Sequence, residues 1–483
     1  MHQRVNFGGN IRVNAQKIFE PRTEKEVVEL LNRNRAEKVR VIGRLHSWSE
    51  VIQAGAVVLN LHHLNQVTIE DGHVQIGAGC QIKSALTELK RHGKTLPSVG
   101  FIAEQSIAGA VSTGTHGSGR HSLSHYVTGV RCARYDRVSG KAVIEDITDG
   151  DDLLALRCSL GTFGVILQVT MQCRDEYLVE ESFHEYDELR QVLSQESRYP
   201  LQQFYLIPWR WNFVAQHRRE STTARSKLAP LYGWYRFVTF DIGMHILILA
   251  AIRLMKSFAV VRILFRYVLR RFVLRGWRVN DDSTTQLVMK HDLFRHIEIE
   301  FFVRAERLPA TMEFLRSLIE SLGSTKASVS ESFVQQLADA EMLRAWENAR
   351  GSYCHHYPIC IRKVLADQTL ISMASETTRG QPSANTAWYA VSLISYQHPK
   401  QRDSFHAFAK ILAECVLKHF DARLHWGKYF PLPETAVRKS YPAMTRFCER
   451  RSAYDPDGRF LNDWTSKLFH NASVHEDKRS TAE

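Results

Sequence analysis

The fold is decided by one short stretch, VIGRLHSWS, at residues 41–49. It begins within an alternating pattern at residues 38–43 that predicts a strand, and it turns at Gly43. A second stretch, RLHWGK at residues 423–428, lies almost four hundred residues further along the chain. Both contain a glycine, where the backbone can approach a ligand closely, and a histidine, whose ring nitrogens can bond to one.

The residues around the first stretch predict an α+β domain. Thr23 and Glu26 form a capping-box pattern ahead of an apolar helical face. Residues 56–61 and 73–78 predict two more strands, and residues 82–89 predict a helix that ends near Gly93.

Residues 105–119, QSIAGAVSTGTHGSG, form a segment of glycine and small polar residues. Consecutive backbone N–H groups in such a segment can hold a diphosphate. The segment lacks the G-x-G-x-x-G pattern between a strand and a helix, which disfavours a nicotinamide enzyme. Taken alone, it would be an ordinary loop. Residues 159–166 add another glycine-containing turn, which leads into a predicted strand.

In this order the motifs resemble those of the FAD-linked aldonolactone and alditol oxidoreductases. This family includes D-arabinono-1,4-lactone oxidase and L-gulonolactone oxidase and belongs to the vanillyl-alcohol-oxidase superfamily. The resemblance covers most of the chain except residues 221–280. It implies a two-lobed α+β flavoprotein with an FAD-binding domain at residues 1–175 and a cap or substrate domain with an antiparallel sheet at residues 176–430. Residues 431–483 would return to the FAD domain.

Alternation within the implied cap domain predicts strands at residues 296–303, 357–364 and 388–395. Helical patterns occupy residues 308–322 and 405–419. Residues 454–462 resemble the family's closing motif, and the polar residues 475–483 are expected to fray.

The resemblance also implies which residues bind FAD. They are Gly43, Arg44, Leu45, His46, Ser47, Ser106, Gly109, Ser112, Thr113, Gly114, Thr115, His116, Gly117, Ser118, Gly119, Gly161, Gly164, Val165, Ile166, His425 and Lys428. His46 is the residue implied to bond covalently to the flavin, since a neutral imidazole at a tight turn can attack the 8α-methyl group. A lone histidine would otherwise be a surface or core residue.

Four residues are implied to be catalytic: Lys428, Arg362, Cys360 and Ser106. A cation at Lys428 near flavin N1 would stabilise the reduced ring, and near the substrate hydroxyl it would favour loss of the proton. Arg362 matches the arginine of the family's Glu-x-Arg strand and would donate to a substrate oxygen. Ser106 matches a serine on the substrate side of the flavin, although its hydroxyl could equally hold its own loop.

Cys360 stands where the family has the glutamate of that strand. A thiol neither carries a carboxylate's charge nor accepts hydrogen bonds well. Glu298 or Glu300 on another predicted strand, or His355 or His356, could compensate. For Glu300 the alternative is an ordinary outward-facing strand residue.

The charge surplus is confined to one segment. The chain carries a net charge of +12, and residues 221–280 hold eleven Lys and Arg against a single acid, Asp241. This concentration argues against a general nucleic-acid-binding face. The segment is also apolar, but its longest uncharged run is well short of the ~20 residues that span a bilayer. Residues 231–276 are therefore expected to lie on an anionic membrane surface; a core helix or a dimer contact is the alternative.

Eight scattered cysteines without a Cys-x-x-Cys pair argue against a disulfide framework or a zinc site, and no metal is expected. A start without a signal-peptide core favours the cytoplasm, at the membrane's cytoplasmic face.

The favoured function is FAD-dependent oxidation of a C–OH group in a sugar lactone or polyol, with oxygen or a quinone as electron acceptor. The alternatives are a lipid-linked sugar or polyol as the substrate, and a flavin-binding membrane scaffold that has lost catalysis.

Overall fold

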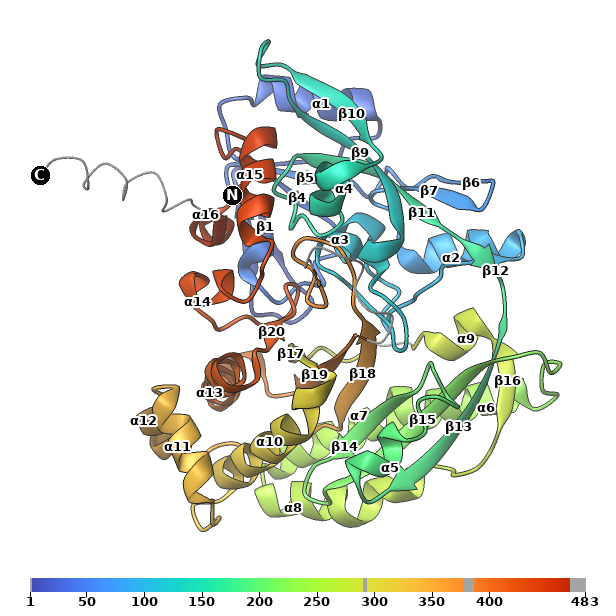
Figure 1. Ribbon diagram of the computed structural model, residues 1–483, viewed down its shortest axis with the longest axis vertical. Helices are drawn as coiled ribbons and strands as arrows, with labels where there is room; N and C mark the ends of the chain where they lie inside the picture. The colour runs from blue at the N-terminus through green and yellow to red at the C-terminus, as the bar shows by residue number, and fades with distance from the viewer. Residues whose placement is uncertain (1, 290–292, 377–385, 470–483) are drawn as a thin grey trace, which may run out of the picture.

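The computed structural model describes residues 2–289, 293–376 and 386–469, so the predicted frayed tail at residues 475–483 lies outside the described residues. Figure 1 shows the N-terminal elements gathered at the top and a large sheet with its helices below. This is the expected two-lobed α+β architecture.

A small parallel sheet carries the first motif. Its strand order is β3 (Lys17–Phe19), β5 (Val57–Asn60) and β4 (Val39–Ile42). Helix α1 (Glu24–Arg33) precedes β4, and the Thr23 hydroxyl accepts from the Glu26 backbone N–H, as the capping pattern predicts. The 41–49 stretch therefore leaves the end of a buried strand.

A five-stranded antiparallel sheet forms the rest of the N-terminal lobe. Its order is β10 (Ala142–Ile147), β9 (Val127–Tyr135), β11 (Val165–Gln172), β7 (His73–Gly77) and β6 (Val67–Glu70). The accompanying helices are α2 (Ile82–Arg91), α3 (Ile107–Ser112) and α4 (Gly150–Leu156). Helix α3 shows that the 105–119 segment is not a loop throughout.

An eight-stranded sheet, in which all neighbouring strands are antiparallel, forms the second lobe. Its order is β16 (Val279–Asp282), β13 (Leu178–Tyr186), β15 (Asn212–Ser221), β14 (Gln203–Ile207), β18 (Ile359–Leu365), β19 (Ala387–Ser395), β17 (Ile297–Arg304) and β20 (Arg423–Leu424). Helices α10 (Leu308–Gly323) and α13 (Asp403–Phe420) pack together, and α13 contacts β17.

Shorter elements complete the described chain. They are β1 (His2–Val5), β2 (Arg12–Ala15), β8 (Lys94–Thr95), β12 (Arg174–Asp175), α5 (Leu189–Leu193), α9 (Ser283–Leu287), α11 (Glu331–Asp339), α12 (Leu343–Ala349), α14 (Glu434–Arg438), α15 (Met444–Tyr454) and α16 (Asp463–Phe469).

The C-terminal segment lies against the N-terminal lobe. The carbonyl of Arg459 accepts from the Val39 N–H at 2.8 Å. The Asn462 amide donates to the carbonyls of Glu50, Val51 and Gln53. These contacts fix both ends of the 41–49 stretch. The predicted domain boundaries themselves stay a prediction.

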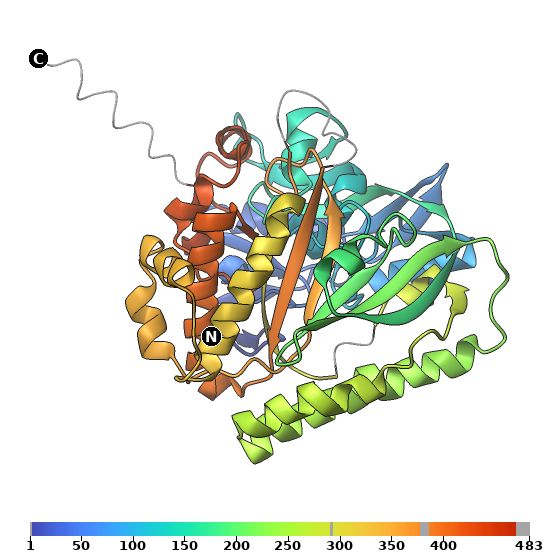
Figure 2. The same ribbon diagram turned by 60° about the horizontal axis from the view of Figure 1, so that its bottom comes forward.

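The basic apolar segment folds as a helical hairpin, residues 229–272, which lies across the base of the molecule (Figure 2). The first arm joins α6 (Ala229–Arg236) and α7 (Met244–Leu249) through π-helical turns at Phe237–Gly243 and Ala250–Met255. The second arm consists of α8 (Phe258–Ile263), a π turn at Leu264–Val268 and a 3-10 turn at Leu269–Phe272.

The first arm is longer than any uncharged run in the sequence, and the expected place of the segment on a membrane surface stays a prediction. Among the described residues, one helix, Ala229–Met255, is long and apolar enough to cross a membrane by length and composition. The uncharged runs are shorter than this helix because Arg236, Asp241 and Arg253 interrupt them; Arg236 and Asp241 are buried, whereas Arg253 is exposed.

Candidate active site

The two motifs singled out in the sequence contact each other. The Trp48 N–H donates to the Gly427 carbonyl at 2.9 Å, and the Ser49 hydroxyl donates to the Trp426 carbonyl at 2.5 Å. The Lys428 ammonium nitrogen lies 4.5 Å from the centre of the Trp48 ring. Residues almost four hundred positions apart therefore form one wall.

Most of the implied FAD residues line a single cavity, here called the cofactor cavity. Those that line it are Gly43, Arg44, Leu45, His46, Ser47, Ser106, Gly109, Ser112, Thr113, Gly161, Gly164, Ile166, His425 and Lys428. Leu45 has φ +57°, the left-handed conformation that turns successive N–H groups towards one side, as an anion-binding nest requires. At Gly43 a Cβ atom would collide with the Ser106 hydroxyl. Gly43 therefore lets this turn pack closely against Ser106, and both residues line the cavity.

Seven implied FAD residues lie outside the lining of this cavity, and their contact with FAD stays a prediction. Thr115 and His116 line the neighbouring substrate cavity, and Gly117 and Ser118 line a third, smaller one. Gly114 faces Met373, the Gly119 N–H donates to the Lys363 carbonyl, and Val165 is a buried strand residue outside the cofactor cavity. The segment leaves the cofactor after Thr113 because α3 ends at Ser112 and the chain then turns towards the second sheet.

Arg40 positions the cofactor cavity, and the sequence analysis missed it. Its buried guanidinium donates to the carbonyls of Val51, Leu160, Gly161 and Phe460. Burial lowers the pKa of Arg40 to about 10. One side chain on β4 therefore holds the turn at residues 160–161 and the C-terminal segment. An arginine inside an alternating apolar strand was the available signal.

A second cavity, the substrate cavity, adjoins the first. Gln105, His425 and Lys428 line both cavities. A flat ring system seated in the cofactor cavity at this shared boundary would present one face or edge to the substrate cavity. The residues present therefore fit a flavin with its reacting end at His425 and Lys428.

The register of the large sheet explains the wall of the substrate cavity. Glu300, Ser392, Cys360 and Tyr205 are opposite one another on β17, β19, β18 and β14. Paired residues share a face, and so do residues two apart on a strand, which adds Glu298 and Arg362 to the same face. Glu300 thus points into the cavity and is 1% exposed, so the outward-facing alternative is wrong.

Glu300 takes two charged or polar partners. Its Oε1 atom lies 3.2 Å from His116 Nε2 and 3.3 Å from Arg362 Nη2. Burial acts to raise the pKa of Glu300, but His116 and Arg362 outweigh it and hold the pKa well below its ordinary value. Burial raises the pKa of the Cys360 thiol to about 11, so it is neutral at pH 7. Glu300 therefore supplies the carboxylate that Cys360 cannot.

Glu298 pairs with Lys428 on the same wall. Its carboxylate accepts from the Lys428 ammonium at 2.5 Å and from the Ser392 hydroxyl. His425 accepts from the Gly427 N–H through Nδ1, and burial lowers the pKa of His425 to about 3. The cluster thus combines two carboxylates, two fixed cations and a neutral imidazole. Ser392 was not predicted from the sequence.

The other proposed compensating residues lie outside this cluster. His355 shares a hydrogen bond with the Tyr353 hydroxyl, and His356 accepts from the Tyr396 N–H. Ser106 lines the cofactor cavity but not the substrate cavity.

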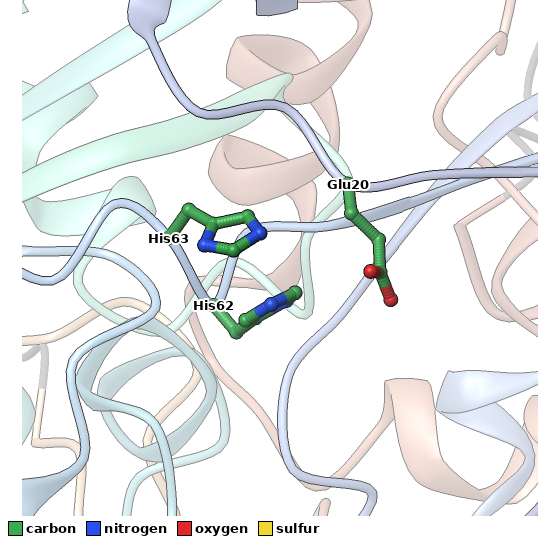
Figure 3. Close-up of side chains that lie close together, drawn as sticks. All are labelled: Glu20, His62 and His63. Atoms are coloured by element: carbon green, nitrogen blue, oxygen red, sulfur yellow. The ribbon is translucent and has the colours of Figure 1, made fainter.

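Two groups of side chains among the described residues have the spacing of metal ligands. In each group an arginine pairs with the carboxylate. The first group is His116, Glu300 and His425, and its carboxylate, that of Glu300, pairs with Arg362. Figure 3 shows the second, Glu20, His62 and His63. There Arg4 pairs with Glu20 at 2.8 Å, and burial together with His63 lowers the pKa of His62. Arginine accounts for the carboxylate in both groups.

Comparisons with known proteins agree with this geometry. Residues 169–468 match the family model of D-arabinono-1,4-lactone oxidase, and residues 15–136 match that of an FAD binding domain. A long-chain alcohol oxidase from an uncultured marine euryarchaeote is 45% identical over 96% of this chain and 97% of its own length. L-gulonolactone oxidase from Mus musculus is 23% identical over 96% and 98%. The structure of cholesterol oxidase from B. sterolicum superposes with a TM-score of 0.73 at 16% identity, over 97% of this chain and 96% of that one.

The fold and the two adjoining cavities define an FAD-dependent oxidoreductase of the vanillyl-alcohol-oxidase type that acts on CH–OH groups. The alternative of a scaffold without catalysis is set aside. The chain belongs to the D-arabinono-1,4-lactone oxidase family, whose model matches more than half of it.

Proposed function

We propose that the protein oxidises the hydroxyl group of an alcohol that carries a long apolar chain. The supporting observation is the lining of the substrate cavity. The catalytic charges gather at the cofactor end, at Glu298, Glu300, Arg362 and Lys428. The apolar residues that line the rest are Phe101, Ile102, Phe183, Ile207, Phe240, Met244, Leu269, Phe272, Val273 and Ile394.

The polar residues elsewhere in this cavity are bonded mainly to one another. Glu185 accepts from Arg210, Asn212 and Arg275. Gln216 accepts from Gln203. A sugar lactone or free polyol has hydroxyl groups along its whole length, and each would lose water here without gaining a partner, which costs about 1–3 kcal/mol per group.

The similar proteins support the same substrate class. The relative with 45% identity bears the name long-chain alcohol oxidase, whereas those named L-gulonolactone oxidase are far more distant. A lipid-linked sugar or polyol remains the second candidate, because it combines an apolar chain with the hydroxyl groups that family members named for lactones act on.

We assign a separate role at the substrate oxygen to each residue of the site. Bound FAD supplies a hydride acceptor for the carbinol carbon. Arg362 donates to the oxygen and fixes it beside the shared boundary of the cavities, while Lys428 stabilises negative charge there. The hydroxyl proton goes to the carboxylate wall, where Glu298 stands next to Lys428. An aldehyde or ketone leaves, and two electrons and two protons, one of them from the carboxylate wall, are later passed to oxygen, which gives hydrogen peroxide, or to a quinone, which gives the quinol. His46, which lines the cofactor cavity, would hold the flavin through a covalent bond.

The proposed place of reaction is the cytoplasmic face of a membrane, with the hairpin in contact with the lipid. An aliphatic alcohol of this kind partitions into lipid, and the exposed apolar and basic residues of the hairpin fit that location.

Anaerobic flavin reduction tests the substrate. Purified holoprotein would be mixed with a detergent-dispersed long-chain primary alcohol, a polyprenyl glycoside, xylitol and L-gulono-1,4-lactone, while the visible flavin absorption is followed. The long-chain alcohol should bleach the flavin fastest. Faster bleaching by xylitol or the lactone would overturn the proposal, and faster bleaching by the glycoside would favour the second candidate.

A further inference from the structure

The hairpin has an outer face unlike the rest of the surface. Among the described residues, eleven of the fourteen exposed large hydrophobic side chains lie between Leu228 and Leu274. They are Leu228, Leu231, Trp234, Val238, Ile246, Leu254, Met255, Phe258, Ile263, Tyr267 and Leu274. Trp234 is 66% exposed and Leu254, close to the bend between the arms, 81%. Such a concentration marks an interaction surface.

The hairpin and its flanks also carry many exposed basic residues, of which only Arg225 and Arg275, among the described residues, form ion pairs, with Asp281 and Glu185. The exposed basic residues of the hairpin and its flanks are Arg225, Lys227, Arg253, Lys256, Arg266, Arg270, Arg271, Arg275 and Arg278. Asp241, the only acid in residues 221–280, is buried. An anionic lipid surface complements both properties, since headgroups neutralise the arginines while acyl chains cover the apolar side chains.

The inner face ties the hairpin to the protein. The Tyr232 hydroxyl donates to Glu181, and Arg236 donates to the Gln286 side chain at 2.8 Å. His245 and the Tyr396 hydroxyl lie 2.6 Å apart. Crossing a bilayer would break these buried contacts, leave Glu181 without its Tyr232 partner and place Arg236 and Asp241 in hydrocarbon, which is costly. Ala229–Met255 therefore has one face for lipid and one for protein.

That inner face is also the wall of the substrate cavity. Phe240 and Met244 of the first arm line it together with Leu269, Phe272 and Val273 at the end of the second. The arms meet nearby, where a Cβ at Gly243 would be in ordinary contact with the Phe272 ring at 3.9 Å. The hairpin thus stands between the proposed lipid surface and the cavity.

We propose that the hairpin docks on an anionic lipid leaflet and passes the alkyl chain of the substrate from the lipid into the cavity along Phe240, Met244 and Phe272. The inference rests on the proposed function for the nature of the substrate, but the docking itself does not. The hydroxyl end then reaches Arg362 and Lys428 while the chain stays in apolar surroundings.

The test compares full-length holoprotein with the triple variant Trp234→Ser, Leu254→Ser, Ile263→Ser, which changes only the outer face. Val138→Ser is the matched control, because Val138 is 96% exposed but lies in the turn between β9 and β10. Cosedimentation uses vesicles of phosphatidylglycerol with phosphatidylcholine, or of phosphatidylcholine alone. The unmodified protein and the control should prefer the anionic vesicles. The triple variant should bind them at least ~10-fold more weakly, through lost apolar burial.

The second measurement is the rate of alcohol oxidation. With a long-chain alcohol embedded in the anionic vesicles, the triple variant should turn over at least ~10-fold more slowly, while its rate on a short, water-soluble alcohol stays unchanged. Indifference of the unmodified protein to anionic vesicles would overturn the docking, even if detergent-dispersed alcohol is oxidised. Vesicle binding without oxidation of any long-chain alcohol would instead overturn the proposed function and the transfer step. An unchanged rate on embedded alcohol would refute the transfer alone.

Discussion

Arg362 and Glu300 approach each other from strands that are not neighbours: Arg362 Nη2 on β18 lies 3.3 Å from Glu300 Oε1 on β17. Between them runs β19, whose Ser392 is opposite both Glu300 and Cys360. In the resembling family a glutamate stands two residues before this arginine. Here Glu300, two strands away in the sheet, supplies the carboxylate instead. Cys360 is left as a neutral, buried thiol.

Cys360→Glu should lower the rate of flavin reduction by the native substrate by at least ~10-fold. The new carboxylate would be the third on a wall that already holds Glu298 and Glu300, and like charges in a buried site oppose one another. It should also fail to create activity on xylitol or L-gulono-1,4-lactone. Cys360→Ser is the control and should stay active. A gain on simple polyols would show that the site still has the lactone-binding form.

Lys428→Met and Arg362→Ala should each slow flavin reduction by at least ~100-fold, because each removes a fixed charge at the reacting centre. Stopped-flow absorbance measures the rate, and flavin content per protein should be unchanged. Lys363→Ala is a suitable control, since Lys363 pairs with Glu196 outside both cavities. Near-normal reduction in either variant would mean that the residue is not at the reacting centre.

His46→Ala should release the flavin on acid precipitation, whereas the unmodified protein should give a yellow pellet. His46 lines the cofactor cavity and stacks on Phe7 at 5.1 Å, so the variant should still bind FAD without the covalent bond. If all flavin of the unmodified protein appears in the supernatant, the covalent bond is absent.

Arg40→Ala should lower the free energy of unfolding by about 3 kcal/mol and reduce the FAD content, because buried carbonyls lose their donor. Arg137→Ala removes an exposed arginine that bonds only the Ala453 carbonyl and serves as control. Denaturant unfolding and flavin absorbance report the two effects. Equal stability of the two variants would contradict the positioning role of Arg40.

Stability should fall as the solution becomes acidic. His425 has its pKa lowered from 6.5 to about 3 in the folded protein, so its contribution is fully present above pH 6.5 and is lost as the pH falls towards 3. His296 and His356, with pKa values of about 3 and 4, act in the same direction. Each such histidine contributes a slope of about 1.4 kcal/mol per pH unit in this window. The Tm should therefore drop between about pH 6.5 and about pH 5, and less steeply in His425→Gln. A flat profile would contradict the burial of these rings.

The sequence predicted secondary structure most accurately where neighbouring residues form a strong pattern, such as alternation or a capping box. The strand before Gly43, the helix capped by Thr23 and the strands at residues 297–304 and 387–395 were all expected. Period-two alternation and capping depend on neighbours in the chain, so a single sequence reveals them.

Contacts between distant strands could not be predicted in this way. The sequence left open whether Glu300 faces inward or outward, because nothing local shows that β17 lies next to β19 and so faces Arg362. Ser392 carried no motif, and its role follows only from the register. The length of Ala229–Met255 was missed because three charged residues interrupt its uncharged runs, and a sequence alone does not show that two of them are buried.

Arg40 has a consequence for biosynthesis. One of its acceptors, the Phe460 carbonyl, lies 420 residues downstream. The Trp48 N–H likewise donates to the carbonyl of a distant residue, Gly427. A ribosome has therefore translated nearly the whole chain before the first motif can take its final shape. Nascent chains that stop short of residue 460 lack this acceptor and should retain FAD poorly, so we expect cofactor loading to follow synthesis of the C-terminal segment.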